Sequence, residues 1–293
     1  MKQALTDTMN QYLDTASAST IYNIGESICV IENPSFDILP NYPYRSPIIV
    51  AIYCQKGMGK GRINAQTYDI CRDTFFIVQP GQITELIEIS DDFKATYIIM
   101  TEEFTDSLGI GNTFNLSRTI AEYPLIELDE RSCRAIESYL TMCRDLAHET
   151  GNPHREEILR LTTRAFFLGL GHTIHKQHTA PKERGAELTT KFLRLVEAHY
   201  RTHRNLSFYA EQMSLTPKYL STAVKATSGK SAMQWIEYYV ILDASSQLSS
   251  TERTIKEIAY DLNFPSQSFF GKYFSRIVGL SPLAYRRKRL QTE

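Results

Sequence analysis

Residues 254–286 read TIKEIAYDLNFPSQSFFGKYFSRIVGLSPLAYR, and this stretch decides the architecture of the C-terminal third of the chain. Its first part repeats apolar residues at helical spacing, which predicts a short helix with one apolar face. Those residues are Ile255, Ile258, Ala259 and Leu262. Asn263 comes next, and asparagine tolerates the left-handed backbone that a sharp turn requires. The pattern predicts a helix that ends in a tight turn.

A second helix is predicted directly after this turn, with Ser266 as its N-terminal cap. Its inward side is Phe269 or Phe270, followed by Tyr273 and Phe274. Small, hydrogen-bonding or cationic residues occupy the other side: Gln267, Ser268, Gly271, Lys272 and Arg276. A short helix, a turn and a second helix with a polar, basic face are typical of a helix-turn-helix. Taken alone, the pattern also fits two packed helices of a bundle.

The same pattern occurs a second time, over residues 207–229. Ala210 corresponds to Ala259 at an offset of 49 residues, and Gly229 corresponds to Gly279 at an offset of 50. The polar face of this copy consists of Lys218, Ser221, Thr222 and Lys225. Between the copies, residues 232–248 lack proline and glycine and predict a connecting helix. This duplication favours two helix-turn-helices over a bundle.

Two helix-turn-helices joined by one helix and closed by GLSPLAYR at residues 279–286 resemble the DNA-binding domain of the AraC/XylS transcriptional regulators. The resemblance covers residues 188–290 and is most specific in the second copy. Four positions depart from the family pattern. Asn263 and Ser214 replace the usual turn glycines, Val240 stands where the connecting helix usually has arginine, and Ser275 stands where lysine is common.

The resemblance implies double-stranded DNA as a partner, with contacts of two kinds. The residues expected at base edges are Lys218, Ser221, Thr222, Gln267, Ser268, Gly271 and Lys272. The residues expected at phosphates are Lys225, Arg276 and Ser231. One rigid connecting helix should hold both second helices in major-groove segments about one turn (roughly 34 Å) apart. RNA polymerase is a further expected partner of such a regulator.

The charge distribution agrees with this expectation. From Glu187 onward, 15 Lys/Arg stand against 9 Asp/Glu, a net charge of +6; the preceding residues carry 17 against 24, a net charge of −7. A basic C-terminal part is the electrostatic footprint of a phosphate-binding domain. Uneven surface charge without a partner is also common, so the charge supports the motif without establishing it.

Composition and cysteine usage indicate a cytoplasmic globular protein. Of the 293 residues, 22% are charged and 42% hydrophobic, which suits two domains with buried cores. The five cysteines form no CxxC pair and lie among apolar neighbours, which favours reduced, buried thiols. The N-terminus shows no apolar signal region, and no run reaches the length of a membrane span. The chain is therefore expected in the cytoplasm, away from membranes.

Short β-rich runs fill residues 21–101 and predict a sandwich or small barrel. The clearest are residues 48–53, 74–78 and 95–100. This rhythm, with RDTFFIVQPG at residues 72–81, resembles the cupin-like jelly roll that precedes many AraC-type domains, although Arg72 replaces the usual glycine. No histidine occurs before His148, so neither a metal-binding cupin nor any cofactor is expected.

Two helices are predicted over residues 128–175, with Asp129 as a cap and a break at Asn152-Pro153. The expected apolar stripes are Ile136, Tyr139, Leu140, Cys143 and Leu146 in the first helix, and Ile158, Leu161, Ala165, Phe166 and Leu168 in the second. The resemblance assigns dimerisation to this region. His172, His175 and His178 lack a neighbouring cysteine or carboxylate, and no metal is expected there.

The predicted fold is therefore α+β with two domains: an N-terminal cupin-like sensing and dimerisation domain over 1–178, with a helical region over 128–178, a linker over 179–187, and an all-α DNA-binding domain over 188–293. Three functions remain open. The first is a homodimeric regulator with a small-molecule effector in the barrel, bound by residues such as Tyr44, Arg45, Tyr53, Gln79 and Tyr97. The second is a barrel enzyme, which no catalytic pair, carboxylate pair or metal cluster supports. The third is a regulator whose N-terminal domain only dimerises or binds a protein.

Overall fold

The computed structural model describes residues 20–24, 27–33, 42–64, 66–110, 116–177 and 184–290. Two compact units divide the chain. The N-terminal unit extends to Thr179, and the C-terminal unit begins at Ala180 and also includes Tyr42–Arg45, which contain the short strand β3 (Tyr44–Arg45). His178 and most of the predicted linker lie outside the described residues, and helix α7 already begins at Arg184.

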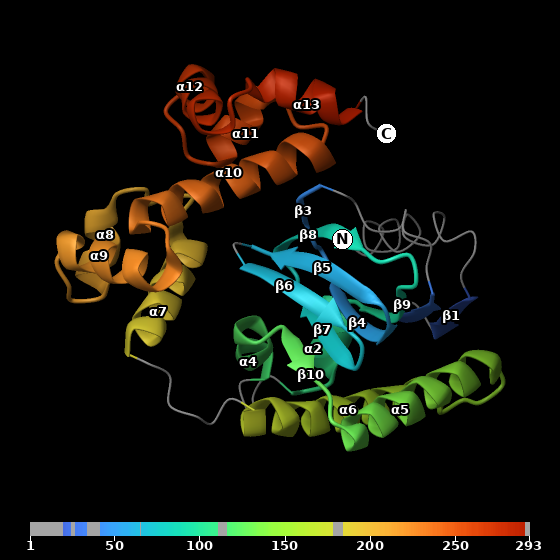
Figure 1. The fold of residues 1–293 in the computed structure, drawn as a ribbon. Helices are drawn as coiled ribbons and strands as arrows, with labels where there is room; N and C mark the ends of the chain where they lie inside the picture. The colour runs from blue at the N-terminus through green and yellow to red at the C-terminus, as the bar shows by residue number, and fades with distance from the viewer. Residues whose placement is uncertain are drawn as a thin grey trace. The chain divides into compact units, whose positions relative to one another are not determined.

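The N-terminal unit contains two antiparallel sheets, coloured blue to green in Figure 1. In spatial order, the larger sheet consists of β1 (Thr20–Ile24), β2 (Ile28–Glu32), β9 (Lys94–Met100), β4 (Ile49–Lys56), β7 (Thr74–Val78) and β10 (Leu125–Glu127). The second sheet contains β8 (Ile83–Ile89), β5 (Met58–Ile63) and β6 (Gln66–Cys71), in that order. The three strands that stood out in the sequence are confirmed as β4, β7 and β9.

The two sheets pack face to face instead of closing into one barrel. Ile52 pairs with Phe76 on one side and with Tyr97 on the other, so these three buried side chains share the face toward the second sheet. Phe76 meets Tyr68 of β6 with ring centroids 5.5 Å apart. A Cβ on Gly61 of β5 would lie only 3.2 Å from the Phe76 ring. Glycine at this position therefore permits the close approach of the sheets, and large side chains fill the space between them.

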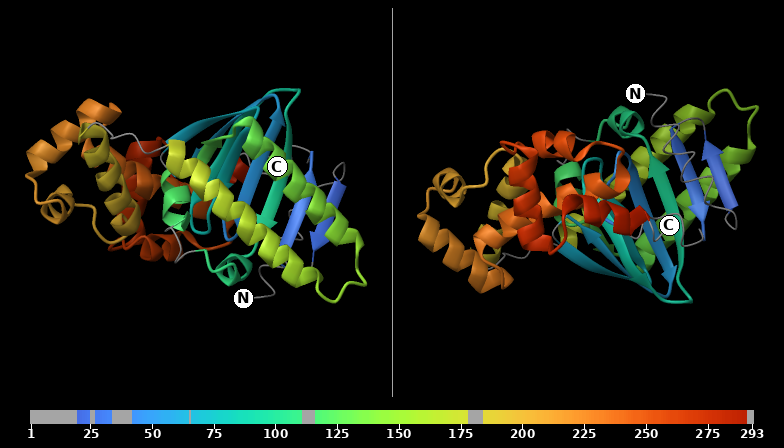
Figure 2. Two further views of the ribbon diagram at one scale, coloured as in Figure 1. Left: turned by 90° about the horizontal axis from the view of Figure 1, so that it is seen from below. Right: turned by 90° about the horizontal axis from the view of Figure 1, so that it is seen from above.

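Helices cover the other face of the larger sheet. They are α2 (Glu102–Ser107), α4 (Leu116–Glu122), α5 (Glu130–His148) and α6 (Arg155–Gln177), and Figure 2 shows α5 and α6 crossing the strands side by side. Asp129 caps α5 as predicted, accepting a hydrogen bond from the Ser132 amide at 2.8 Å. The predicted stripe of α5 is confirmed, since all five of its residues are buried.

Three residues of the predicted α6 stripe, Ile158, Phe166 and Leu168, are half-buried and pack against the core, but the stripe misses the most buried side of this helix. Its buried residues are Leu159, Thr163, Phe167, Leu170 and Ile174. Leu161 is 52% exposed instead, and Ala165 is also exposed. Apolar residues lie on more than one side of this helix, so spacing alone did not identify the side that packs on the sheet.

The five cysteines are all free thiols. Cys29, Cys54 and Cys143 are buried as predicted, and burial raises the pKa of the Cys54 and Cys143 thiols to about 11. Cys71 is exposed, contrary to the prediction, because it ends strand β6 with its side chain facing solvent. No helix in the described part of the chain has the length and apolar character needed to cross a membrane.

The C-terminal unit is helical apart from β3. Its helices are α7 (Arg184–His199), α8 (Leu206–Gln212), α9 (Pro217–Ser228), α10 (Ala232–Ser250), α11 (Ile255–Asp261), α12 (Gln267–Val278) and α13 (Pro282–Leu290). The connecting helix α10 packs against both α9 and α12, and Figure 1 shows it in orange between the two helix pairs. The predicted α+β architecture, with an all-α C-terminal part, is confirmed.

Candidate nucleic-acid interface

The two helix pairs α8–α9 and α11–α12 turn in the same way. Ser214 and Asn263 both adopt left-handed backbone, with φ values of 55° and 54°. In each turn the next residue closes the same hydrogen bond back to the first helix: the Leu215 amide donates to Ala210, and the Phe264 amide donates to Ala259, both at 2.8 Å. The duplication predicted from sequence is thus present in the backbone, and two residues other than glycine occupy the left-handed position.

The second helix of each pair is capped at both ends. The hydroxyl of Thr216 accepts from the Tyr219 amide of α9, and the hydroxyl of Ser266 accepts from the Phe269 amide of α12. Gly229 and Gly279 end these helices in left-handed conformation, with φ values of 75° and 81°. These local signals fix the length of both helices independently of tertiary contacts. We call α9 and α12 the recognition helices.

The buried sides of the recognition helices are equivalent. Leu220 and Val224 of α9 are fully buried, as are Phe270 and Phe274 of α12. This packing directs the predicted polar faces away from the core. Lys218, Thr222, Lys225, Gln267, Ser268, Lys272 and Arg276 are exposed, and Ser221 and Gly271 are half-buried. A Cβ on Gly271 would meet nothing within 4 Å, so the backbone there is open to close approach by a partner.

Several candidate residues already have partners within the protein. The Thr222 hydroxyl donates to the Lys218 carbonyl at 2.9 Å, which leaves its lone pair and methyl group for outside contacts. Arg276 forms an ion pair with Glu237 at 2.8 Å. The Ser231 hydroxyl caps α10 by accepting from the Gln234 amide. Within the described residues, the ammonium groups of Lys218, Lys225 and Lys272 form no such ion pair, so they are available to a ligand.

Two exposed aromatic rings on the recognition helices were not predicted from the sequence. Phe269 is 64% exposed and Tyr219 is 55% exposed, whereas Phe270 is the buried member of the Phe269-Phe270 pair. Aligning Leu220 with Phe270 places Tyr219 opposite Phe269, which is the signal that could have identified both. Each recognition helix therefore presents one aromatic ring beside its polar residues.

A cationic depression of about 380 Å³ lies beside α12. Arg204, Lys272 and Arg276 all line it, together with Phe264, Pro265, Phe269 and Tyr273. Burial raises the pKa of Tyr273 to about 12, and the negative charge of Glu237 adds to this rise, so the phenol is neutral. The depression places the guanidinium groups of Arg204 and Arg276, which suit phosphate contacts, beside Lys272, which is expected at a base edge.

Arg204 also contacts the turn between α11 and α12. The spacing of residues in the sequence did not predict this contact. Its guanidinium lies 3.8 Å from the centroid of the Phe264 ring and donates to the carbonyl groups of Leu262 and Asn263. Burial lowers the pKa of this guanidinium. The loop between α7 and α8 thereby stabilises a turn nearly 60 residues away in sequence.

The connecting helix α10 is anchored by a buried carboxylate. Asp243 is fully buried and accepts from the Tyr200 hydroxyl at 2.6 Å and from Arg201 Nε at 2.7 Å. Gln247, one turn further along, donates to Asp243 at 3.3 Å and to Asp261 of α11 at 2.8 Å. The network joins the residues that follow α7, the middle of α10 and the last residue of α11.

The predicted ligand residues are not gathered in one place. Tyr53 is buried against the helices, and Tyr97 is buried between the sheets, where burial raises the pKa of its phenol. Tyr44 and Arg45 form β3, which groups with the C-terminal unit. Of the five, Gln79 lines a cavity between the larger sheet and α2, α4 and α6. Among the described residues, no group of three or more His, Cys, Asp or Glu is arranged to hold a metal ion.

Comparison with known proteins identifies the C-terminal region. Residues 209–288 match the family model of a helix-turn-helix domain. The arabinose operon regulatory protein of Salmonella typhimurium is 28% identical over 85 residues, which are 29% of this chain and 30% of that protein. The C-terminal region therefore carries the AraC-type DNA-binding domain that the sequence predicted.

Longer matches exist at similar or lower identity. The regulatory protein PocR of Salmonella typhimurium is 27% identical over 172 residues, 59% of this chain and 49% of PocR. The chain thus spans about half the length of this relative and less than a third of the arabinose regulator. Among solved structures, ToxT from Vibrio cholerae is 16% identical, with a TM-score of 0.42, and the match covers 89% of this chain and 98% of that one.

Proposed function

We propose that this protein is a sequence-specific DNA-binding transcription regulator that acts by binding and not by catalysis. The observation that supports the proposal is the paired geometry of α9 and α12. Two turns with the same backbone conformation and hydrogen bonds present two polar faces that are joined by a single helix. The expected partners are duplex DNA and RNA polymerase, and the expected compartment is the cytoplasm.

The proposed contacts differ along the recognition helices. Lys218, Ser221 and Thr222 of α9 face base edges, as do Gln267, Ser268 and Lys272 of α12, with the backbone at Gly271 close to the groove. Lys225, Arg204 and Arg276 neutralise phosphates. The rings of Tyr219 and Phe269 supply apolar contacts of the kind that recognise thymine methyl groups.

Replacing Lys272 by Ala tests this assignment. The substitution should cost about 1–3 kcal/mol of binding free energy on a duplex selected from random sequence and should relax the preference at one base position. Lys225→Ala is the matched control on the other recognition helix. It should weaken binding to all duplexes alike and lower the slope of log K against log salt concentration by about one. Equal, sequence-independent losses for both variants in salt titrations would refute the base-edge assignment of Lys272.

The N-terminal unit is proposed to form a homodimer and to sense a small molecule. Leu161 of α6 and Met142 of α5 are both exposed, and the two helices are neighbours, since the Thr162 hydroxyl lies 3.1 Å from the Met142 sulfur. We expect sedimentation of the full chain at micromolar concentration to show a dimer, and Leu161→Glu to shift it toward monomer, because burying a carboxylate in an apolar interface is unfavourable. If the wild-type protein sediments as a monomer, the proposed dimer is wrong, whereas the proposal that the N-terminal unit senses a small molecule is not affected.

A further inference from the structure

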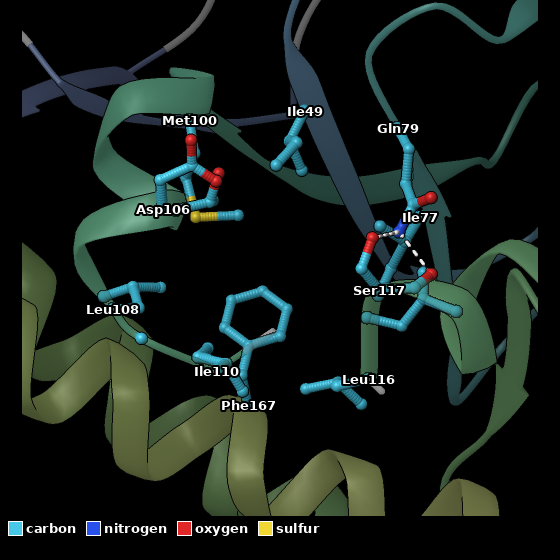
Figure 3. Close-up of a pocket in the computed structure, with 13 residues that line it drawn as sticks. Ile49, Ile77, Gln79, Met100, Asp106, Leu108, Ile110, Leu116, Ser117 and Phe167 are labelled. Atoms are coloured by element: carbon cyan, nitrogen blue, oxygen red, sulfur yellow. Dashed lines mark hydrogen bonds between the residues drawn. The ribbon is translucent and has the colours of Figure 1, made fainter. Parts of the chain in front are cut away.

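One cavity of the N-terminal unit lies outside the sandwich interior. It has a volume of about 330 Å³, at the lower end of the range for small-molecule sites. Its walls come from the helix-facing side of the larger sheet and from α2, α4 and α6, as Figure 3 shows. The space between the two sheets, where the cupin-like resemblance placed a ligand, is instead filled by side chains such as Phe76 and Tyr97.

Two short helices contribute to the wall of the cavity. Leu108 follows α2, which has six residues, and Leu116 begins α4, which has seven. Gly171 of α6 allows α4 to pack closely, since a Cβ there would lie 2.9 Å from Leu116 Cδ1. Met100 and Phe167 close the inner end, and both are buried. The walls are therefore fixed by packing, and most of the lining is apolar.

The polar side chains at the rim include acceptors of Gln79 and Asp106, and one donor, the Ser117 hydroxyl, which accepts from Gln79 Nε2 at 3.3 Å. Gln79 Nε2 donates to the Ser117 carbonyl at 2.8 Å, which leaves Gln79 Oε1 as the free end of that amide. The Thr105 hydroxyl donates to the Glu102 carbonyl at 2.8 Å. Asp106 adds an exposed carboxylate, and no Lys, Arg or His lines the cavity among the described residues. Arg164 lies near the lining residue Gly109, with Nη1 3.6 Å from the position of a Cβ built there.

We propose that this cavity binds a compact apolar molecule that carries one hydrogen-bond donor, an amine or a hydroxyl, and that it discriminates against organic acids. The apolar walls take the body of the ligand, and Asp106 accepts from its donor group; Figure 3 shows Asp106 and Gln79 on opposite sides of the cavity. A carboxylate would be repelled by Asp106, and the Ser117 hydroxyl is the one side-chain hydroxyl donor that the described lining offers it. Any effect of this ligand on DNA affinity rests on the proposed function, whereas its binding to the cavity does not.

Fluorescence of the full chain with the neutral dye N-phenyl-1-naphthylamine tests the site. The competitors are 4-butylbenzylamine, 4-butylbenzyl alcohol and 4-butylbenzoate, which share one apolar body and differ in the polar group. The amine and the alcohol should displace the dye at concentrations about tenfold below the benzoate, the difference expected for one hydrogen bond to a charged acceptor. Tighter binding of the benzoate would overturn the proposal.

Two kinds of substitution show where the ligand binds: reversing the charge of Asp106, and filling the cavity with a larger side chain. Asp106→Lys should invert the preference between amine and benzoate, while Glu103→Lys, on the same helix but outside the cavity, should leave it unchanged. Ile120→Phe should abolish dye binding, with Leu116→Phe as the second variant if the first fails to fold. Dye binding that survives in a folded filling variant would refute the site. The dye assay contains no DNA, so it tests the cavity independently of the proposed function. If the wild-type protein binds the dye and fails to bind DNA, only the proposed function is contradicted.

Discussion

Replacing Asp243 by Ala should lower the free energy of unfolding of the C-terminal unit by about 3 kcal/mol. The carboxylate is fully buried and accepts from Tyr200, Arg201 and Arg45, so its removal leaves a buried hydroxyl and two guanidinium groups without this acceptor. Breaking one partner of a buried ion pair typically costs about 3–5 kcal/mol, and the partial exposure of Arg201 places this case near the lower end. Gln247 also loses one of its two acceptors.

Urea unfolding followed by tryptophan fluorescence measures this effect directly. The chain has one tryptophan, Trp235, which is 7% exposed and lies on α10 in the same unit. Its signal therefore reports the C-terminal unit even if the N-terminal unit unfolds separately. Glu252→Ala is the matched control, because Glu252 is an exposed acid just after α10 and should change stability by less than about 0.5 kcal/mol. Similar midpoints for both variants would show that the network contributes little.

The helix-turn-helix geometry could be predicted because its determinants are local. Asn263 at the turn, Ser266 at the cap and the spacing of Ile258, Ala259 and Leu262 act within a few residues of one another, and the structure confirms each of them. The repeat at an offset of about 49 residues turned one ambiguous pattern into a specific one. The predicted helix caps and strands are confirmed for the same reason, because they too depend on residues that are close together in the sequence.

Features that depend on distant packing could not be predicted. Phe269 and Phe270 are neighbours with the same chemistry, and only contact with Phe264 and the core decides which is buried. Arg204 contacts the turn through a loop nearly 60 residues away. The cavity is a gap between a sheet and three helices, and no sequence pattern encodes a gap. Choosing ligand residues by polarity on strands therefore selected Tyr53 and Tyr97, which packing buries elsewhere.

The spacing between the two DNA segments should be fixed by α10. This helix runs without a break from Ala232 to Ser250 and contacts both recognition helices, and the Asp243 network ties it to α7 and α11. A rigid α10 holds α9 and α12 at one separation. A flexible connection would instead let the two helices bind DNA segments that lie farther apart. The predicted register is one helical turn of DNA, about 10 base pairs.

Inserting five base pairs between the two segments of a selected duplex should therefore lower affinity at least about 100-fold, toward the level of non-specific binding, because the second segment turns to the opposite face. Inserting ten base pairs restores the face but adds roughly 34 Å, which a continuous helix cannot span, so affinity should stay low. Ten base pairs inserted outside the site are the control and should have no effect. Electrophoretic mobility shifts at constant salt would measure all four duplexes. Recovery with the ten-base-pair internal insertion would mean that the two helix-turn-helices move independently, and the rigid role of α10 would be wrong.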